Sequence, residues 1–400
     1  MFKSILRTLV GCYLVASLTQ TVSAAPAPAQ KIFVTMGKDL SHHVFTEKSN
    51  KIVSTHDDLT VVEITPEDFE KISHSAHEEF NRCGGFMAHN SLEEAMAELD
   101  GNATREFAKN VSLADYSLNQ ANTVKAHIGE AKEINIRNTI IKLSSFRNRY
   151  YKSQTGLESQ EWLLEQWKRI TAKRNDIKVY KFKHTDWPQD TIVAEIEGAS
   201  SEKIIVGGHA DSVAGWWGRE RAHAPGADDN ASGIATMTEV LRVLVDSGYK
   251  PQKTIVFAAY AAEEVGLLGS KDMAKTYKAQ NETILGVLQL DMTNFQGSEQ
   301  DIVMMTDYTN EGQNKFIATL IDTYLPGVSW GYGKCGYACS DHASWTSQGF
   351  PASMPFEAKK NDMNPHIHTS RDTLAQSDNH AKHALKFAKM ALAYVIELDN

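Results

Sequence analysis

The chain has 400 residues, long for one ordinary domain and enough for a large hydrophobic core with additional segments. Its composition is that of a globular protein, with 42% hydrophobic and 23% charged residues, and its formal net charge is −9. No long basic block is present, so the composition does not indicate a nucleic-acid partner.

The N-terminus has the pattern of an export signal. Lys3 and Arg7 give it a positive start, residues 9–18 form a short apolar run, and Val22-Ser23-Ala24 is a small-residue cleavage site. Neither this run nor any later one is long enough to span a bilayer, which takes about 18 apolar residues or more. We therefore expect residues 1–24 to be a cleaved signal peptide and the mature protein to be secreted, with no membrane partner.

A small segment with its own pattern follows the signal. Residues 31–37 and 59–65 have the composition of strands, and residues 66–80 that of a helix whose N-cap is Thr65. We therefore expect a small α+β unit, which together with its linkers spans residues 25–107.

Two further expectations concern this segment. The polar stretch 99–110 is interpreted as an exposed linker, where proteolytic processing would occur. The histidines of the small unit are scattered and lie in no cluster of ligand types. We therefore expect no metal site among His42, His43, His56, His74 and His77.

From about residue 110, strand and helix patterns alternate. Alternation of this kind indicates an α/β fold, a three-layer sandwich with a mostly parallel central sheet flanked by helices. In the helix expected at 159–171, Trp162, Leu163, Trp167 and Ile170 have the spacing of core residues. The other expected helices are 134–151, 231–244, 310–324 and 379–398, and the expected strands are 177–182, 191–197, 204–206, 254–260 and 284–290.

Three of these strands run directly into residue types that bind metals. Residues 204–206 lead through two glycines into His209, residues 254–260 lead into Glu263-Glu264, and residues 284–290 lead into Asp291. Sites in such sheets lie just beyond the carboxyl ends of the strands. The repetition predicts one site built from all three strand ends.

A fourth contribution comes from the loop 224–233, where Asp228 and Asp229 lie between a Pro-Gly turn and a helix start. Imidazole and carboxylate ligands together suit zinc. So many acids would place too much negative charge around one ion. The usual solution is a second metal ion, with one carboxylate bridging the two. A late histidine would complete the set, and His366 and His368 remain alternatives.

Three acids have expected roles at or beside the metals. Asp211, two residues after His209, is placed to hold the imidazole tautomer from outside the ligand set. Glu263 and Glu264 offer a general base next to a metal ligand, and the spacing alone does not say which is which.

In an oxidising compartment, Cys335 and Cys339 are close enough in sequence to pair.

Six segments resemble the motifs of the di-zinc aminopeptidase family, and most closely its secreted leucyl aminopeptidases of the Vibrio and Aeromonas type and their fungal counterparts. They are GGHADS (207–212), PGADDNASG (225–233), AYAAEEVG (259–266), LQLDMTN (288–294), GYACSDHASW (336–345) and IHTSRDTL (367–374). The resemblance implies a catalytic domain at 108–400, active on the N-termini of peptides, and a propeptide at 25–107 that is a removable inhibitor or folding aid. We expect a monomer, although the sequence itself does not fix the oligomeric state.

The resemblance further implies two zinc ions per chain. Asp229 would bind both, with Glu264 and His368 completing one site and His209 and Asp291 the other. It gives Glu263 as general base, Tyr337 as hydrogen-bond donor to the oxyanion, and Cys335–Cys339 as a disulfide. It gives an apolar pocket for the N-terminal side chain, lined by Met292, Met305, Met354, Phe356 and Ile367.

Some features depart from close relatives and leave other functions open. Lys360 and Met363 stand near the pocket where close relatives have aromatic residues, which leaves the preferred N-terminal residue open. A glutaminyl-peptide cyclase of the same fold, with one zinc, is the main alternative. A carboxypeptidase of this fold and a non-enzymatic binding domain are the others, although a binding domain should have lost ligands that this chain retains.

Overall fold

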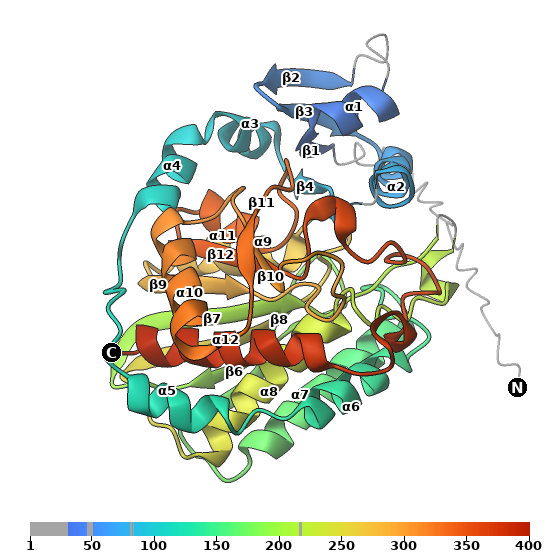
Figure 1. Ribbon diagram of the computed structural model, residues 1–400. Helices are drawn as coiled ribbons and strands as arrows, with labels where there is room; N and C mark the ends of the chain where they lie inside the picture. Colours follow the sequence, from blue (N-terminus) through green and yellow to red (C-terminus); the bar gives the residue numbers. More distant parts are fainter. Residues whose placement is uncertain (1–30, 46–50, 81, 83, 216–217) are drawn as a thin grey trace, which may run out of the picture. The chain divides into compact units, whose positions relative to one another are not determined.

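The computed structural model of the protein describes residues 31–400 apart from 46–50, 81, 83 and 216–217 (Figure 1). Residues 31–400 form one compact unit. The expected signal peptide, residues 1–24, and the linker after it lie outside the described residues.

An eight-stranded sheet organises residues 121–400, in the order β11-β10-β12-β9-β7-β8-β6-β5. The central strands β12, β9, β7 and β8 run parallel, whereas β10 is antiparallel to β12, β6 to β8 and β5 to β6. The sheet is therefore mixed, with its parallel strands at the centre. Its strands are β5 (Ile177–Phe182), β6 (Thr191–Ile196), β7 (Ser200–His209), β8 (Lys253–Tyr260), β9 (Ile284–Gln289), β10 (Ile302–Met305), β11 (Trp330–Gly333) and β12 (Ala352–Phe356).

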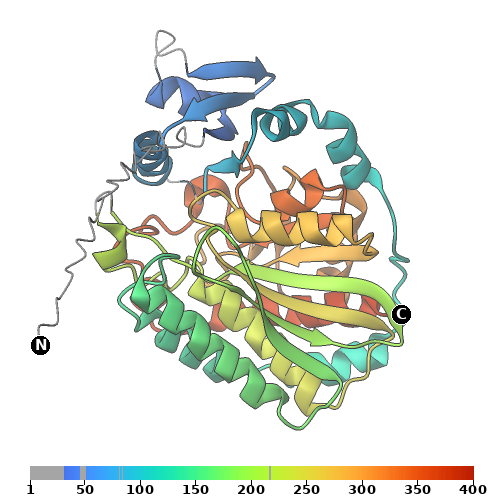
Figure 2. The ribbon, with the colours of Figure 1, turned by 180° about the vertical axis from the view of Figure 1, so that it is seen from behind.

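Helices cover both faces of this sheet, as Figures 1 and 2 show from opposite sides. One face packs against α5 (Ala121–Ile128), α6 (Glu133–Ser144), α7 (Gln154–Thr171), α8 (Ala231–Asp246), α10 (Glu311–Tyr324) and α12 (Lys382–Leu398). The other packs against α9 (Leu268–Ala279) and α11 (His342–Ser347). Trp167 and Leu163 of α7 are buried in the first layer. The prediction of an α/β fold with helices on both sides of the sheet is confirmed.

Residues 31–110, which we call the N-terminal segment, form a second, smaller sheet in the order β2-β3-β1-β4. Its strands are all antiparallel: β1 (Ile32–Gly37), β2 (Ile52–His56), β3 (Leu59–Ile64) and β4 (Phe86–His89). One face packs against α1 (Lys38–Val44) and α2 (Pro66–His74), the other against α3 (Leu92–Asp100). The Thr65 hydroxyl caps α2 by accepting from the backbone N–H of Asp68, as expected.

Two expectations about secondary structure were wrong. Residues 99–110 are not an exposed linker: α3 ends at Asp100, α4 (Asn102–Asn110) begins after the single residue Gly101, and Leu99 and Ala108 are buried. The stretch without regular structure is instead 111–120. The helix expected at 134–151 ends at Ser144, because Asn148 and Arg149 are buried in a loop where their side chains bind backbone carbonyl groups.

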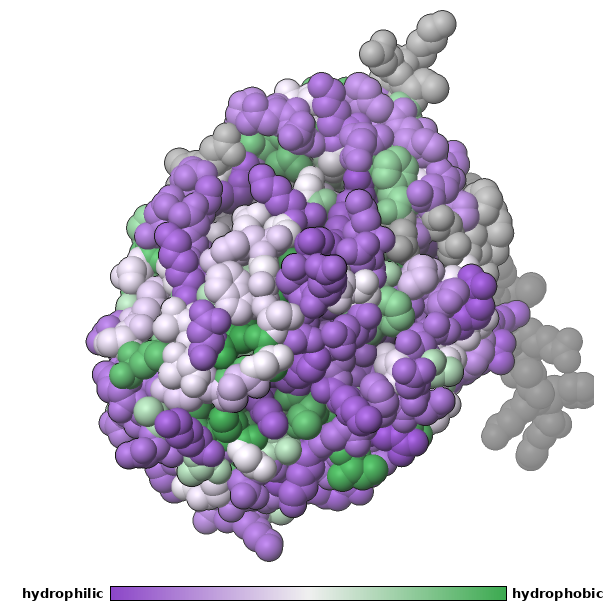
Figure 3. Space-filling view, in the orientation of Figure 1, coloured by the Kyte–Doolittle hydropathy of each residue, from purple (hydrophilic) through white to green (hydrophobic). Residues whose placement is uncertain are grey.

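The surface agrees with the globular composition. Figure 3 shows hydrophilic residues over most of one face, with hydrophobic residues in small separate patches. Among the described residues, no helix combines the length and the apolar composition that a membrane span needs.

Candidate metal centre

The ends of the central parallel strands bring the expected ligand residues together. His209 is the last residue of β7, Asp291 lies two residues after β9, and Glu263-Glu264 follow β8. Asp229 immediately precedes Asn230, whose side chain caps α8 by accepting from the backbone N–H of Gly233. All of these side chains point to the same edge of the sheet, as the strand pattern predicts.

Positive φ angles accompany the site. Ala262, Met292 and His368 have φ values of 56°, 53° and 56°, a region that residues other than glycine adopt rarely. Each is a candidate ligand or lies next to a candidate ligand or base. Such strain collects at functional sites, where the surrounding structure maintains it.

One cluster consists of His209, Asp229 and Asp291, all buried. Nε2 of His209 lies 3.0 Å from Oδ1 of Asp229 and 3.3 Å from Oδ1 of Asp291. Two ligands bound about 2.0–2.1 Å from a tetrahedral zinc ion lie roughly 3.3 Å apart. The spacing in this cluster therefore fits one metal ion.

A second cluster, which includes Glu264 and His368, lies beside the first, and the second oxygen of Asp229 reaches its histidine His368. Nε2 of His368 lies 2.9 Å from Oδ2 of Asp229 and 3.2 Å from Oε2 of Glu264. The two oxygens of Asp229 thus face two different imidazoles, which is the arrangement of a carboxylate between two metals. His366, the alternative to His368, belongs to neither metal-type cluster among the described residues.

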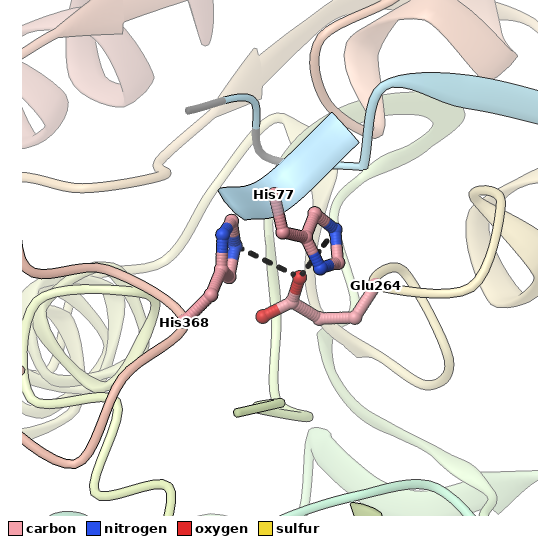
Figure 4. Close-up of side chains that lie close together, drawn as sticks. All are labelled: His77, Glu264 and His368. Atoms are coloured by element: carbon pink, nitrogen blue, oxygen red, sulfur yellow. Dashed lines mark ion pairs between the residues drawn. The ribbon is translucent and has the colours of Figure 1, made fainter. Parts of the chain in front are cut away.

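The second cluster also contains a residue that the sequence analysis excluded. His77, from the N-terminal segment, lies with its Nε2 atom 3.7 Å from Oε2 of Glu264 (Figure 4). Its ring stacks on that of His368 with centroids 3.9 Å apart. The expectation that no histidine before residue 108 lies at a metal-type cluster was therefore wrong, because the contact joins parts of the chain almost 200 residues apart.

Glu263 and Glu264 are held by Asp211. The Asp211 carboxylate accepts the backbone N–H of Glu263 at 3.0 Å and that of Glu264 at 3.2 Å, and it lies 3.5 Å from Nδ1 of His209. Glu264 is a member of a cluster, whereas Glu263 lies alongside, 4.0 Å from Nε2 of His209. The geometry thus separates the two acids, which the spacing did not.

The charges of this site favour a cation. Burial, followed by repulsion from Asp229, raises the pKa of Glu264 to about 7, and burial likewise raises that of Glu263 well above its usual value. No hydrogen bond of acceptable geometry reaches either carboxylate oxygen of Glu264 or Nε2 of His368 among the described residues. Buried acids so close together need positive charge or protons. The donor set, two or three imidazoles with three carboxylates, fits zinc.

Three supporting residues were missed by sequence reasoning. Asp372 accepts the backbone N–H groups of Asp228 and Asp229, at 3.1 and 3.0 Å. The buried guanidinium of Arg149 donates to the carbonyl oxygens of Ala210 and Gly226, at 3.0 and 2.9 Å. Ser340 donates a 2.6 Å hydrogen bond to Oδ2 of Asp291. The sequence could have indicated only Asp372 and Ser340 as site residues, because these two lie in segments that resemble family motifs.

The expected pocket residues form one buried cluster beside the site. Met292, Met305, Met354, Phe356 and Ile367 pack together with Tyr337 and Cys339. Cys335 and Cys339 form a disulfide, with Cα atoms 6.2 Å apart. Lys360 lies outside this cluster, with Nζ 4.7 Å from the centre of the Tyr337 ring and a 2.9 Å hydrogen bond to the carbonyl of Cys335.

Comparison with known proteins shows the family of the chain. The model of "Peptidase family M28" matches residues 191–395. The chain belongs to peptidase family M28. It is 38% identical over 302 residues to a probable leucine aminopeptidase 1 of Trichophyton verrucosum, covering 70% of this chain and 78% of that protein. It is 32% identical over 366 residues to leucine aminopeptidase 1 of Fusarium vanettenii, covering 88% and 91%.

Solved structures agree at the level of the fold. The LapA aminopeptidase of Legionella pneumophila matches with a TM-score of 0.78 and 28% identity, over 92% of this M28 chain and 98% of that one. That coverage extends into residues before 110. A glutaminyl cyclase of Fimbriiglobus ruber, at 15% identity and a TM-score of 0.52, shares the fold alone. The predicted resemblance is confirmed, and so is the prediction of a metallo-aminopeptidase.

Proposed function

We propose that this protein is a secreted aminopeptidase that binds two zinc ions and removes an N-terminal leucine or another large hydrophobic residue from peptides. The observation that carries the proposal is the position of Asp229. Its two oxygens lie 3.0 Å from His209 and 2.9 Å from His368, so that one carboxylate serves two ligand clusters. His209 and Asp291 would hold one zinc, and Glu264 and His368 the other.

Secretion and processing are part of the proposal. The signal pattern of residues 1–24 and the Cys335–Cys339 disulfide both suit an oxidising compartment. Residues 25–107 would be the propeptide and 108–400 the catalytic domain. The stretch 111–120, which has no regular structure, is the nearest segment that a processing protease could enter.

Zinc ions bound here would supply a nucleophilic water at neutral pH and polarise the carbonyl of the first peptide bond. The chain's own part begins with Glu263. Its carboxylate lies beside the ligand clusters and is oriented through Asp211, so it can accept the proton of the attacking water and pass it to the leaving amine. The pKa of Glu263, raised by burial, suits a group that accepts and then returns a proton.

Two further groups would act on the substrate. The Tyr337 hydroxyl, in the loop closed by the disulfide, would donate a hydrogen bond to the oxyanion. The methionine-rich cluster around Met305 and Met354 would receive the side chain of the N-terminal residue, because flexible thioethers adapt to an apolar side chain.

The test measures metal content and hydrolysis together, on the protein after proteolytic release of its N-terminal segment. We expect two zinc ions per chain and faster cleavage of leucyl-p-nitroanilide than of alanyl or lysyl analogues, with no cleavage of N-acetyl-leucyl-p-nitroanilide. One zinc ion, no hydrolysis and cyclisation of glutaminyl peptides would replace the proposal with the cyclase alternative.

A further inference from the structure

The N-terminal segment reaches the candidate metal centre through one short π-helical turn. This turn, Ser75–Glu79, continues α2, and the backbone N–H of Phe80 donates to the carbonyl of Ser75. Turns of this kind are rare and occur frequently at functional sites. Ser73, just before the turn, accepts a 2.8 Å hydrogen bond from the Arg219 guanidinium. The turn is therefore anchored to the catalytic part as well as to its own helix.

His77 is aimed into the second cluster from this turn. It is 5% exposed, its Nε2 atom has no hydrogen-bond partner among the described residues, and its ligand atom lies within 4.8 Å of those of Glu264 and His368. Figure 4 shows both histidine side chains directed at the same oxygen of Glu264. A buried imidazole nitrogen without a partner costs free energy, and a metal ion between these three residues would remove that cost.

The same segment covers the other groups to which we assign chemistry. A Cβ atom at Gly84 would lie 2.8 Å from Oε1 of Glu263, so the backbone there approaches the proposed base closely. The Arg82 guanidinium lies 4.6 Å from the centre of the Tyr337 ring. Glu263, Glu264 and His209 have no exposed surface, and Tyr337 is 4% exposed. In the part of the chain that the structure describes, the segment therefore lies over these groups and leaves them almost no surface that a peptide substrate could reach.

We propose that His77 is a ligand of the metal held by Asp229, Glu264 and His368, and that the N-terminal segment keeps the enzyme latent through this bond. Catalytic zinc sites keep three protein ligands and one open position, whereas four protein ligands make a closed site of the structural type. His77 supplies the fourth ligand. Release of the segment opens that position, so the inference rests on the proposed function and adds its regulation.

The test replaces zinc by Co²⁺ in the full-length chain and compares the visible absorption of the wild type with that of His77→Phe. Phenylalanine retains a ring to stack on His368 but has no lone pair to bind a metal. We expect the cobalt bands to change in position and intensity, and the affinity for Zn²⁺ to fall by at least about tenfold, a loss typical when a site's supporting groups are altered. His42→Ala, an exposed histidine of the same segment, should leave both unchanged.

A second experiment measures the activity of the chain before and after the segment is separated. A specific protease site inserted into 111–120 allows the full-length chain and the separated catalytic part to be compared on leucyl-p-nitroanilide. We expect the separated part to be active, full-length wild type to be nearly inactive, and full-length His77→Ala to lie between them. Unchanged cobalt bands in His77→Phe, or equal activity before and after separation, would overturn the inference. A separated part that holds zinc but hydrolyses no substrate would instead overturn the proposed function.

Discussion

The backbone N–H of Asp229 donates a 3.0 Å hydrogen bond to the carboxylate of Asp372, and the N–H of Asp228 donates to the same group at 3.1 Å. Asp372 is fully buried and is not one of the proposed metal ligands, yet it holds the backbone of the loop that carries Asp229, the proposed bridging carboxylate. Groups in this position typically change metal affinity or activity by about 10–100-fold.

The Asp372→Asn variant should therefore bind zinc about 10–100-fold more weakly, as groups outside a ligand set commonly do when altered. An amide keeps the size of the carboxylate but offers one accepting oxygen in place of two. Zinc affinity is measured by competition with a chelator, and circular dichroism checks the fold. Asp378→Asn, an exposed aspartate six residues further along, is the matched control. Wild-type affinity in Asp372→Asn would mean that the loop needs no such support.

Variants of Glu263 and Asp229 should separate catalysis from metal binding. Glu263→Gln should keep both zinc ions and lose turnover by roughly 10²–10⁴-fold, since general acid–base catalysis contributes about that much. Asp229→Asn should lose zinc as well, because it faces both imidazoles. Metal analysis beside leucyl-p-nitroanilide kinetics on the released catalytic part distinguishes the variants. Equal zinc loss in both would contradict the assigned roles.

The methionine cluster predicts a change in substrate preference. Met305 is fully buried on β10 and packs with Met354 and Phe356. Met305→Phe should lower kcat/KM for leucyl relative to alanyl substrate by roughly 10–200-fold, the range that about one misplaced methylene produces in an apolar pocket. Met305→Leu conserves volume and should change the ratio little. A ratio unaffected by phenylalanine would place the N-terminal side chain elsewhere.

The parallel strands and their ligand-bearing ends were predictable from the sequence, for a local reason. Apolar runs such as 204–206 and 284–290 end at His209 and Asp291, and the carboxyl ends of neighbouring parallel strands meet at one edge of a sheet. The directions of the outer strands were not predictable. An antiparallel neighbour such as β6 has the same pattern of apolar and polar residues as a parallel strand.

His77 and Arg149 show what the sequence could not provide. Each is a single polar residue in an ordinary local pattern, and its partners lie about 190 and 60–80 residues away. For residues 99–110 a local signal was present, but it was misleading. Asp100-Gly101-Asn102 has the composition of a turn, but here Gly101 only separates two helices, and tertiary burial of Leu99 and Ala108 outweighs the local preference.

Lys271 predicts that the attachment of the N-terminal segment depends on pH. Its ammonium group, on α9, is buried against the Ala88 carbonyl and lies 2.8 Å from Nδ1 of His89. Burial and the neighbouring Lys275 lower its pKa from 10.5 to about 7, although Glu94 and Glu98 act in the opposite direction. The folded chain therefore binds fewer protons at this lysine than the unfolded chain between about pH 7 and 10.5.

Stability should consequently rise with pH across that window, since stability increases wherever the unfolded state holds more protons. The gain in the free energy of unfolding that comes from Lys271 is complete above pH 10.5. It is lost progressively as the pH falls to about 7, and below that pH the effect of Lys271 is constant. We expect the free energy of unfolding of wild type minus that of Lys271→Met to increase between pH 7 and 10 in urea titrations. Lys168→Met, at an exposed site on α7, should show no such trend. A difference independent of pH would mean that Lys271 keeps its ordinary pKa and that this contact does not make the attachment of the segment depend on pH.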